Sequence, residues 1–268
     1  MIRFGLGIKK KARYLAKEFQ YWVQNNLRRP HLFNLRNEER IGVVYHVPSD
    51  MCVTDRIMLY ALVRGLKPHR ALEIGVRWGG SARIITNAMQ ENGIGKLVGI
   101  EPITEQFRAK SQTLHDRYEL VRGYSPDAIV EAVKKLDGPL DFVFIDALHI
   151  HDAALADCRG VIPHLAQGGH LLLHDTYHVG ICEAVNKILR EEGNFVDCGF
   201  LTRNPRVGKP VSYQGLRLIR LGPVDGYDLI KKAYREAGQG EPELGSHLWN
   251  YDEYFNRIGK AKYRLSDK

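Results

Sequence analysis

Short apolar runs alternate with longer amphipathic segments through the middle of the chain, from residue 70 to residue 192. Uninterrupted runs such as "FVFI" and "HLLL" are typical of strands that are buried on both faces of a sheet. The segments between them have the three- and four-residue apolar spacing of helices. The predicted strands are 70–75, 96–102, 118–123, 140–147 and 169–175, and the helices that follow them are 81–91, 104–114, 126–136, 152–165 and 180–192.

Strict alternation of strand and helix predicts an open, mostly parallel sheet with right-handed crossovers. Two further strand candidates, 195–202 and 215–222, have no helix between them, only a linker rich in Pro, Gly and basic residues. They predict an antiparallel hairpin. The expected fold is therefore α/β, a doubly wound, mostly parallel Rossmann-like sheet that ends in an antiparallel hairpin.

The same pattern divides the chain into three parts: an N-terminal helical arm over 1–49, the α/β domain over 50–222 and a C-terminal extension over 223–268. Within these parts, residues 32–50 are expected to be irregular and 227–237 helical. A helix at 55–65 should open the domain, with Thr54 as its N-cap and Gly65 at its end.

The arm carries most of the net charge. Residues 1–40 hold ten basic and three acidic residues, whereas the whole chain has a net charge of +8. Apolar residues recur there at helical spacing, which predicts a basic amphipathic helix. We favour packing of its apolar stripe on the protein's own core or on a second subunit in a homo-oligomer. Contact with an anionic membrane surface and binding of RNA are the alternatives.

Composition also indicates where the protein is located. No apolar run reaches 18 residues, so no membrane-spanning helix is predicted. No apolar h-region follows the basic N-terminus, so we expect no secretory signal. The four cysteines are widely spaced and predict free thiols, which favours a cytoplasmic location.

Polar residues follow every predicted parallel strand. Because ligands bind at the carboxyl ends of such strands, these positions are candidate site residues. They are Glu73 and Gly75, Glu101, Tyr124 and Ser125, Asp146 and His149, and His174 and Asp175.

The turn after the first strand reads E-x-G-x-x-x-G-G-S, from Glu73 to Ser81. It differs from the G-x-G-x-x-G fingerprint of dinucleotide-binding proteins, and its acid is a poor neighbour for a pyrophosphate. An acid there suits a cation such as an ammonium or a sulfonium. Glu101, which ends the second strand, is placed to accept hydrogen bonds from two ribose hydroxyls.

These motifs resemble class I S-adenosylmethionine-dependent methyltransferases over roughly residues 50–222. "EIGVRWGGSA" with "GYSPDAI" is similar to the cofactor site of the catechol-type O-methyltransferases. "FIDALH" and "LLLHDT" resemble the macrolide-sugar and cephalosporin-pathway enzymes. The resemblance implies S-adenosylmethionine as the cofactor, held by Glu73, Gly75, Gly79, Ser81, Glu101, Tyr124, Ser125 and Asp146.

In those families, acids after the fourth and fifth strands hold a divalent metal such as Mg²⁺, and the matching positions are Asp146 and Asp175. His174 stands where the sugar enzymes carry an acid, and Thr176 where the catechol enzymes carry Asn. A ligating His174 would shift the preference toward a transition metal. The resemblance also implies that His149 is the base and that Asp146 is a second catalytic residue.

The predicted function is methyl transfer to a hydroxyl of a small molecule or sugar. Either a metal assists the reaction, or His149 acts as the base without one. A nucleic-acid methyltransferase is an alternative, although "DALH" replaces the Asn-Pro-Pro-aromatic motif of base methylation. A non-catalytic cofactor-binding subunit and an NAD-dependent oxidoreductase are further alternatives. The set of Asp146, His149 and Asp175 argues against a subunit without activity.

Overall fold

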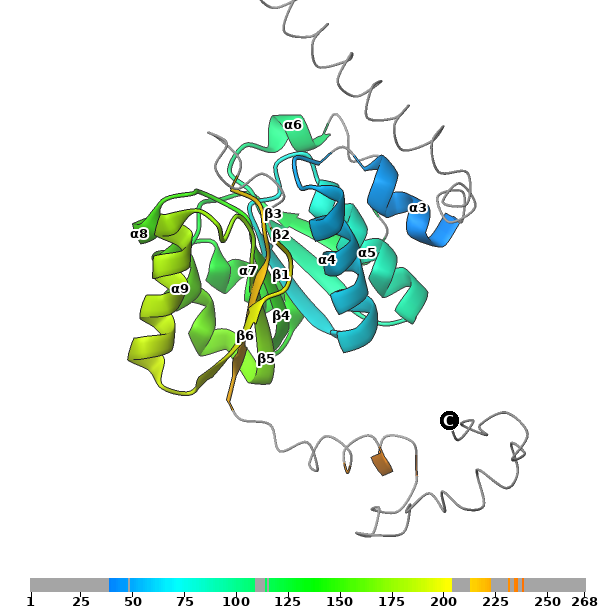
Figure 1. Cartoon of the computed structure of the whole chain (residues 1–268). Helices are drawn as coiled ribbons and strands as arrows, with labels where there is room; N and C mark the ends of the chain where they lie inside the picture. The colour runs from blue at the N-terminus through cyan, green and yellow to red at the C-terminus, as the bar shows by residue number, and fades with distance from the viewer. Residues whose placement is uncertain are drawn as a thin grey trace, which may run out of the picture. The chain divides into compact units, whose positions relative to one another are not determined.

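The computed structural model describes residues 39–47, 49–108, 114, 116–203 and 213–222, together with 231, 234, 235 and 238 (Figure 1). The chain divides into two units after Gly222. The predicted helix of the arm lies outside the described residues. Within the extension, Lys231, Tyr234 and Arg235 are helical.

The first unit contains one seven-stranded sheet. Its order is β3-β2-β1-β4-β5-β7-β6, with β7 antiparallel to both of its neighbours and the other pairings parallel. This confirms the predicted fold class, including the terminal hairpin. The strands are β1 (Arg70–Ile74), β2 (Lys96–Ile100), β3 (Tyr118–Val121), β4 (Leu140–Ile145), β5 (Leu165–Leu173), β6 (Phe195–Phe200) and β7 (Arg217–Leu221).

Helices cover both faces of the sheet (Figure 1). On one face, α4 and α5 pack over the cluster that includes Phe142 and Phe144, and on the other, α7, α8 and α9 cover the cluster that includes Val143 and Ile145. Alternate residues of β4 thus face opposite layers, and all four are buried. The helices are α3 (Glu39–His46), α4 (Val53–Leu66), α5 (Gly80–Asn92), α6 (Thr104–Arg108), α7 (Ile129–Leu136), α8 (His151–Val161) and α9 (Val179–Glu192).

Two expectations near the start of the domain were wrong. Helix α3 occupies part of the segment expected to be irregular, because Val44 and Val47 bury their side chains in the core. Helix α4 starts at Val53 with Cys52 as its N-cap, and continues through Gly65 to a left-handed cap at Lys67. Thr54 therefore lies inside the helix and Gly65 does not end it.

One boundary near the other end of the domain also differs. The helix expected over 152–165 ends at Val161, and a 3₁₀ turn, η2 (Ile162–His164), leads into β5. Strand β5 starts at Leu165, ahead of the predicted position, and its register against β4 shifts between Leu140 and Phe142. Pro163 and the glycines at 168 and 169 obscured this extra strand segment in the sequence.

The strand order creates a crevice. From β1 the chain builds outward to β2 and β3, and it then returns to β4 on the other side of β1. The carboxyl ends of β1 and β4 are therefore neighbours at the switch point, where ligands of such sheets bind.

None of the described helices is long and apolar enough to cross a membrane. All four cysteines are free thiols, as expected.

Candidate active site

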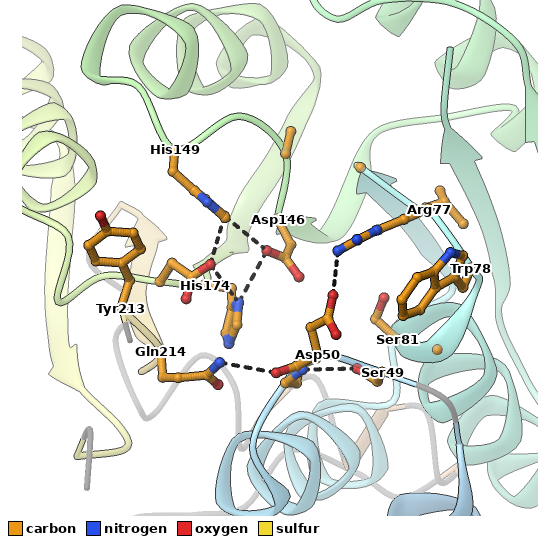
Figure 2. A pocket seen from close by; sticks show the side chains of 16 residues that line it. Ser49, Asp50, Arg77, Trp78, Ser81, Asp146, His149, His174, Tyr213 and Gln214 are labelled. Carbon is orange, nitrogen blue, oxygen red and sulfur yellow. Dashed lines mark hydrogen bonds and ion pairs between the residues drawn. The ribbon is translucent and has the colours of Figure 1, made fainter. Parts of the chain in front are cut away.

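A cavity of about 330 Å³ opens at this switch point (Figure 2). In Figure 2, Tyr213 and Gln214 stand on one side and Arg77 and Trp78 on the other, with Asp146 and His174 between them. The segments that line it are 49–51, 75–78, 80–81, 146–147, 149, 174–175 and 213–214.

The glycine turn packs closely against the backbone at the end of β4. Gly75 has φ +86°, and a Cβ on it would lie 2.2 Å from the carbonyl oxygen of Asp146. Gly79 has φ +77° and caps α5, with the ring of Phe107 3.0 Å from where its Cβ would be. Because only glycine fits these positions, the turn lies directly against the end of β4 and presents the first turn of α5 to the cavity.

Glu73 lies beneath the cavity rather than in its wall. Its side chain is fully buried, and it accepts a hydrogen bond from the Ser81 hydroxyl. Burial raises the pKa of Glu73 to about 8, against the opposing effect of the Ser81 hydrogen bond. At neutral pH the carboxyl is therefore mainly protonated, and it supports Ser81, which does line the cavity.

Glu101 braces the glycine turn from the opposite side. Its Oε2 accepts hydrogen bonds from the amides of Val76 (3.1 Å) and Arg77 (2.7 Å). Its Oε1 accepts one from the amide of Ile103 (2.9 Å). These bonds help to hold Arg77 at φ +49°. A ribose would have to share this carboxylate with the turn.

The other predicted cofactor residues are spread more widely. Tyr124 is exposed, and Ser125 is half-buried with it after β3. Of the eight predicted cofactor residues, the cavity wall includes Gly75, Ser81 and Asp146, and the other five lie outside it.

The predicted polar cluster after β4 and β5 does come together. The Nε2 atom of His149 lies 2.7 Å from Oδ2 of Asp175 and 3.8 Å from Oδ1 of Asp146. The Asp146 and Asp175 carboxylates raise the pKa of His149 to about 9. Burial opposes ionisation of Asp175, but hydrogen bonds from His149 and His174 outweigh it and keep its pKa below its usual range.

His174 lines the cavity after β5, as predicted, and its ring also reaches the first turn of α4. It is buried, with Nδ1 3.1 Å from Oδ1 of Asp146 and Nε2 3.1 Å from Oδ2 of Asp55. Both ring nitrogens thus face carboxylates. Within the described residues, the set with converging ligand atoms is Asp146, His149 and Asp175, and these atoms all lie within 4.8 Å of one another.

Several residues in or behind the cavity wall were not singled out from the sequence. Asp55, which holds His174, read only as an acid in the first turn of a helix. Gln214 joins two loops, because its Oε1 accepts from the Cys52 amide (2.8 Å) and its Nε2 donates to the Asp50 carbonyl (3.0 Å). The ring of Tyr213 packs edge-on against His178, with centroids 4.4 Å apart. No local pattern pointed to these long-range contacts.

Comparisons with known proteins give a family-model match and a shared fold. A family model described as a methyltransferase domain matches residues 72–176, which include the glycine turn, Glu101 and the Asp146, His149 and Asp175 cluster. Among curated proteins, none matches the chain.

Solved structures share the fold. The O-methyltransferase from Bacillus cereus, in complex with SAH, aligns with a TM-score of 0.52 and 19% identity, covering 69% of this chain and 89% of that one. SAH-bound PaMTH1 from Podospora anserina aligns with a TM-score of 0.51 and 20% identity (69% and 87% covered). Cofactor-bound Rv0187 from MTB gives a TM-score of 0.53 and 19% identity (68% and 87% covered). Residues 72–176 thus match a methyltransferase-domain model, and the first unit of the chain has the fold of these solved methyltransferase structures.

Proposed function

We propose that the protein transfers a methyl group from S-adenosylmethionine to a hydroxyl of a small molecule or sugar, with His149 as the base. The observation that carries this proposal is the His149–Asp175 contact of 2.7 Å at the wall of a cavity that the glycine turn also lines. A cofactor bound at the glycine turn and the His149 imidazole would thereby face the same cavity.

The cavity fits the cofactor's charges. Ser81 and Gly80 begin α5, and the amide groups at a helix N-terminus favour a carboxylate such as that of the methionine moiety. Asp146 supplies negative charge on the facing wall, which suits a sulfonium. Methyl transfer itself is an in-line displacement, so the protein's main task is to align donor and acceptor and exclude water.

His149 must be neutral to accept a proton from the acceptor hydroxyl. With a pKa of about 9, most of it is protonated at neutral pH in the cofactor-free protein. A positive charge bound beside Asp146 opposes the imidazolium and lowers its pKa. Cofactor binding would therefore prepare the base, and Asp175 would keep the ring oriented toward the acceptor.

The same three side chains also fit a divalent metal, because two carboxylates and an imidazole offer ligand atoms within 4.8 Å of one another. Asp146, His149 and Asp175 would hold it, and a bound metal would lower the pKa of an acceptor hydroxyl. In that arrangement His149 would be a ligand rather than the base.

Calorimetry and a transfer assay test the proposal. We expect micromolar binding of S-adenosylmethionine and S-adenosylhomocysteine, and none of NAD. Label from [methyl-³H]S-adenosylmethionine should then appear in a member of a panel of phenols, catechols and sugars. Tight NAD binding without adenosylmethionine binding would refute the cofactor assignment. Label found in nucleic acid and in no hydroxyl compound would refute the acceptor class.

A further inference from the structure

The carboxylate that contacts His149 stands on an unfavourable backbone conformation. Asp175 has φ +53°, in the left-handed region that residues with a Cβ seldom adopt. Such a conformation costs free energy and persists only where its surroundings hold it. Since this turn directs Oδ2 of Asp175 to within 2.7 Å of His149, whatever holds the turn also sets the geometry of the pair.

A contact on each side of Asp175 leads to the same buried side chain, that of Asp55. On the preceding side, Nε2 of His174 lies 3.1 Å from Oδ2 of Asp55. On the following side, the amide and hydroxyl of Thr176 donate to the Gly215 carbonyl, at 3.2 and 3.1 Å. The Gly215 amide in turn donates to the same Oδ2 of Asp55, at 2.9 Å. The chain of contacts therefore closes on itself around Asp175.

Asp55 does not serve the helix on which it stands. An acid near this position of a helix commonly reaches back to the amide of the N-cap residue. Here the N-cap amide, that of Cys52, donates to Gln214 instead (2.8 Å). Asp55 is turned inward with no exposed surface, although burying a carboxylate is costly unless it is hydrogen-bonded. Helix capping does not account for its orientation.

We propose that Asp55 is the positioning residue of the active site: through His174 and Gly215 it holds the left-handed turn that brings Asp175 to His149. This inference rests on the proposed function, in which the His149–Asp175 pair accepts a proton. Asp55 touches neither acceptor nor cofactor in this scheme. It acts by keeping the neighbouring carboxylate in place.

The test compares Asp55→Ala and Asp55→Asn with the wild-type protein. Asn keeps an oxygen that can accept from His174 and from the Gly215 amide, whereas Ala removes both contacts. Since small displacements of positioned groups can cost about 10²-fold, we expect kcat of Asp55→Ala to fall roughly 10–10²-fold. The dissociation constant for S-adenosylmethionine should stay within about twofold, since the glycine turn is untouched, and Asp55→Asn should recover most of kcat.

Val63→Ala is the matched control, because Val63 is equally buried on the same helix but does not line the cavity. It should lower thermal stability and leave kcat unchanged. Crystal structures provide a readout that does not depend on activity: in Asp55→Ala, Asp175 should leave the left-handed region and its contact with His149 should be lost.

The outcomes separate this inference from the proposed function. If Asp175 keeps its conformation in Asp55→Ala, the inference is wrong, whatever the activity. Equal losses of kcat in Asp55→Ala and Val63→Ala would likewise reduce Asp55 to a structural role. If the wild-type protein transfers no methyl group while Asp55→Ala still releases the Asp175 turn, the proposed function fails and the positioning role stands.

Discussion

The imidazole of His149 and the carboxylate of Asp175 meet at 2.7 Å, each from a turn that follows a central strand of the sheet. The contact stabilises the charged forms of both groups, which raises the pKa of the histidine and lowers that of the acid. In the proposed mechanism, this contact would orient the base but keep it protonated until the sulfonium binds.

Replacing His149 with Ala should lower turnover by roughly 10²–10⁴-fold, the usual contribution of a general base. Calorimetry should show nearly unchanged affinity for S-adenosylmethionine. His151→Ala is the control, because that ring pairs with Asp152 and lies outside the cavity wall. Full activity of His149→Ala would leave alignment as the protein's only contribution.

The pH dependence should show a rising limb. Only neutral His149 accepts a proton, so kcat/KM should increase with pH and level off above about 9, the pKa in the free protein. The limb in kcat should lie at lower pH, because the bound sulfonium opposes the imidazolium. Initial rates from pH 6 to 10 measure both limbs, and a kcat/KM profile that is flat over this range would contradict the assignment.

Zn²⁺ should inhibit the reaction, because it would bind Nε2 of His149 together with Asp146 and Asp175 and so break the His149–Asp175 contact that orients the ring. We expect EDTA to reverse this inhibition and to leave the untreated enzyme active. The opposite result, in which EDTA abolishes activity and Mg²⁺ or Mn²⁺ restores it, would assign the three side chains to a resident metal.

Glu73→Gln should make stability less dependent on pH. A carboxyl whose pKa is raised from 4.5 to about 8 stabilises the fold fully below pH 4.5, and this contribution is lost as pH rises toward 8. Between these values each pH unit costs up to about 1.4 kcal/mol. Relative to wild type, the variant should therefore gain in Tm between pH 5 and pH 8, while a constant difference would show that Glu73 is ionised in the fold.

Gly75→Ala should abolish cofactor binding and destabilise the domain, because the new Cβ would collide with the Asp146 carbonyl at a positive φ. Gly65→Ala provides the contrast: it lies inside α4 with nothing within 4 Å, and alanine there should raise stability by about 1 kcal/mol. Thermal unfolding and calorimetry on both variants distinguish local collision from a general sensitivity to alanine.

The sheet could be predicted because its strands are continuous apolar runs with helices between them. The residues at the strand ends followed from the same topology, which is why Asp146, His149 and Asp175 were identified together. Hairpin strands β6 and β7 were equally visible, since no helical segment separates them.

The roles within the site were harder to predict, because they depend on side-chain direction. His174 follows β5 and lines the cavity just as Asp175 does, yet its ring also contacts Asp55, far away in sequence. Glu73 matched a known motif, but its strand carries it beneath the cavity floor. The periodicity of apolar residues predicts where a strand ends, but it does not predict the direction in which each side chain at that end points.

Gln214 makes the two loop walls of the cavity dependent on each other, since it binds the backbone of both Asp50 and Cys52. The glycine turn, Asp146 and Asp175 follow directly on strands β1, β4 and β5, whereas residues 49–51 and 213–214 precede α4 and β7. Under the proposed function, substrate preference could therefore change without alteration of the glycine turn, but only if both loops change together. A library meant to alter that preference should diversify the two segments jointly, with Gln214 retained.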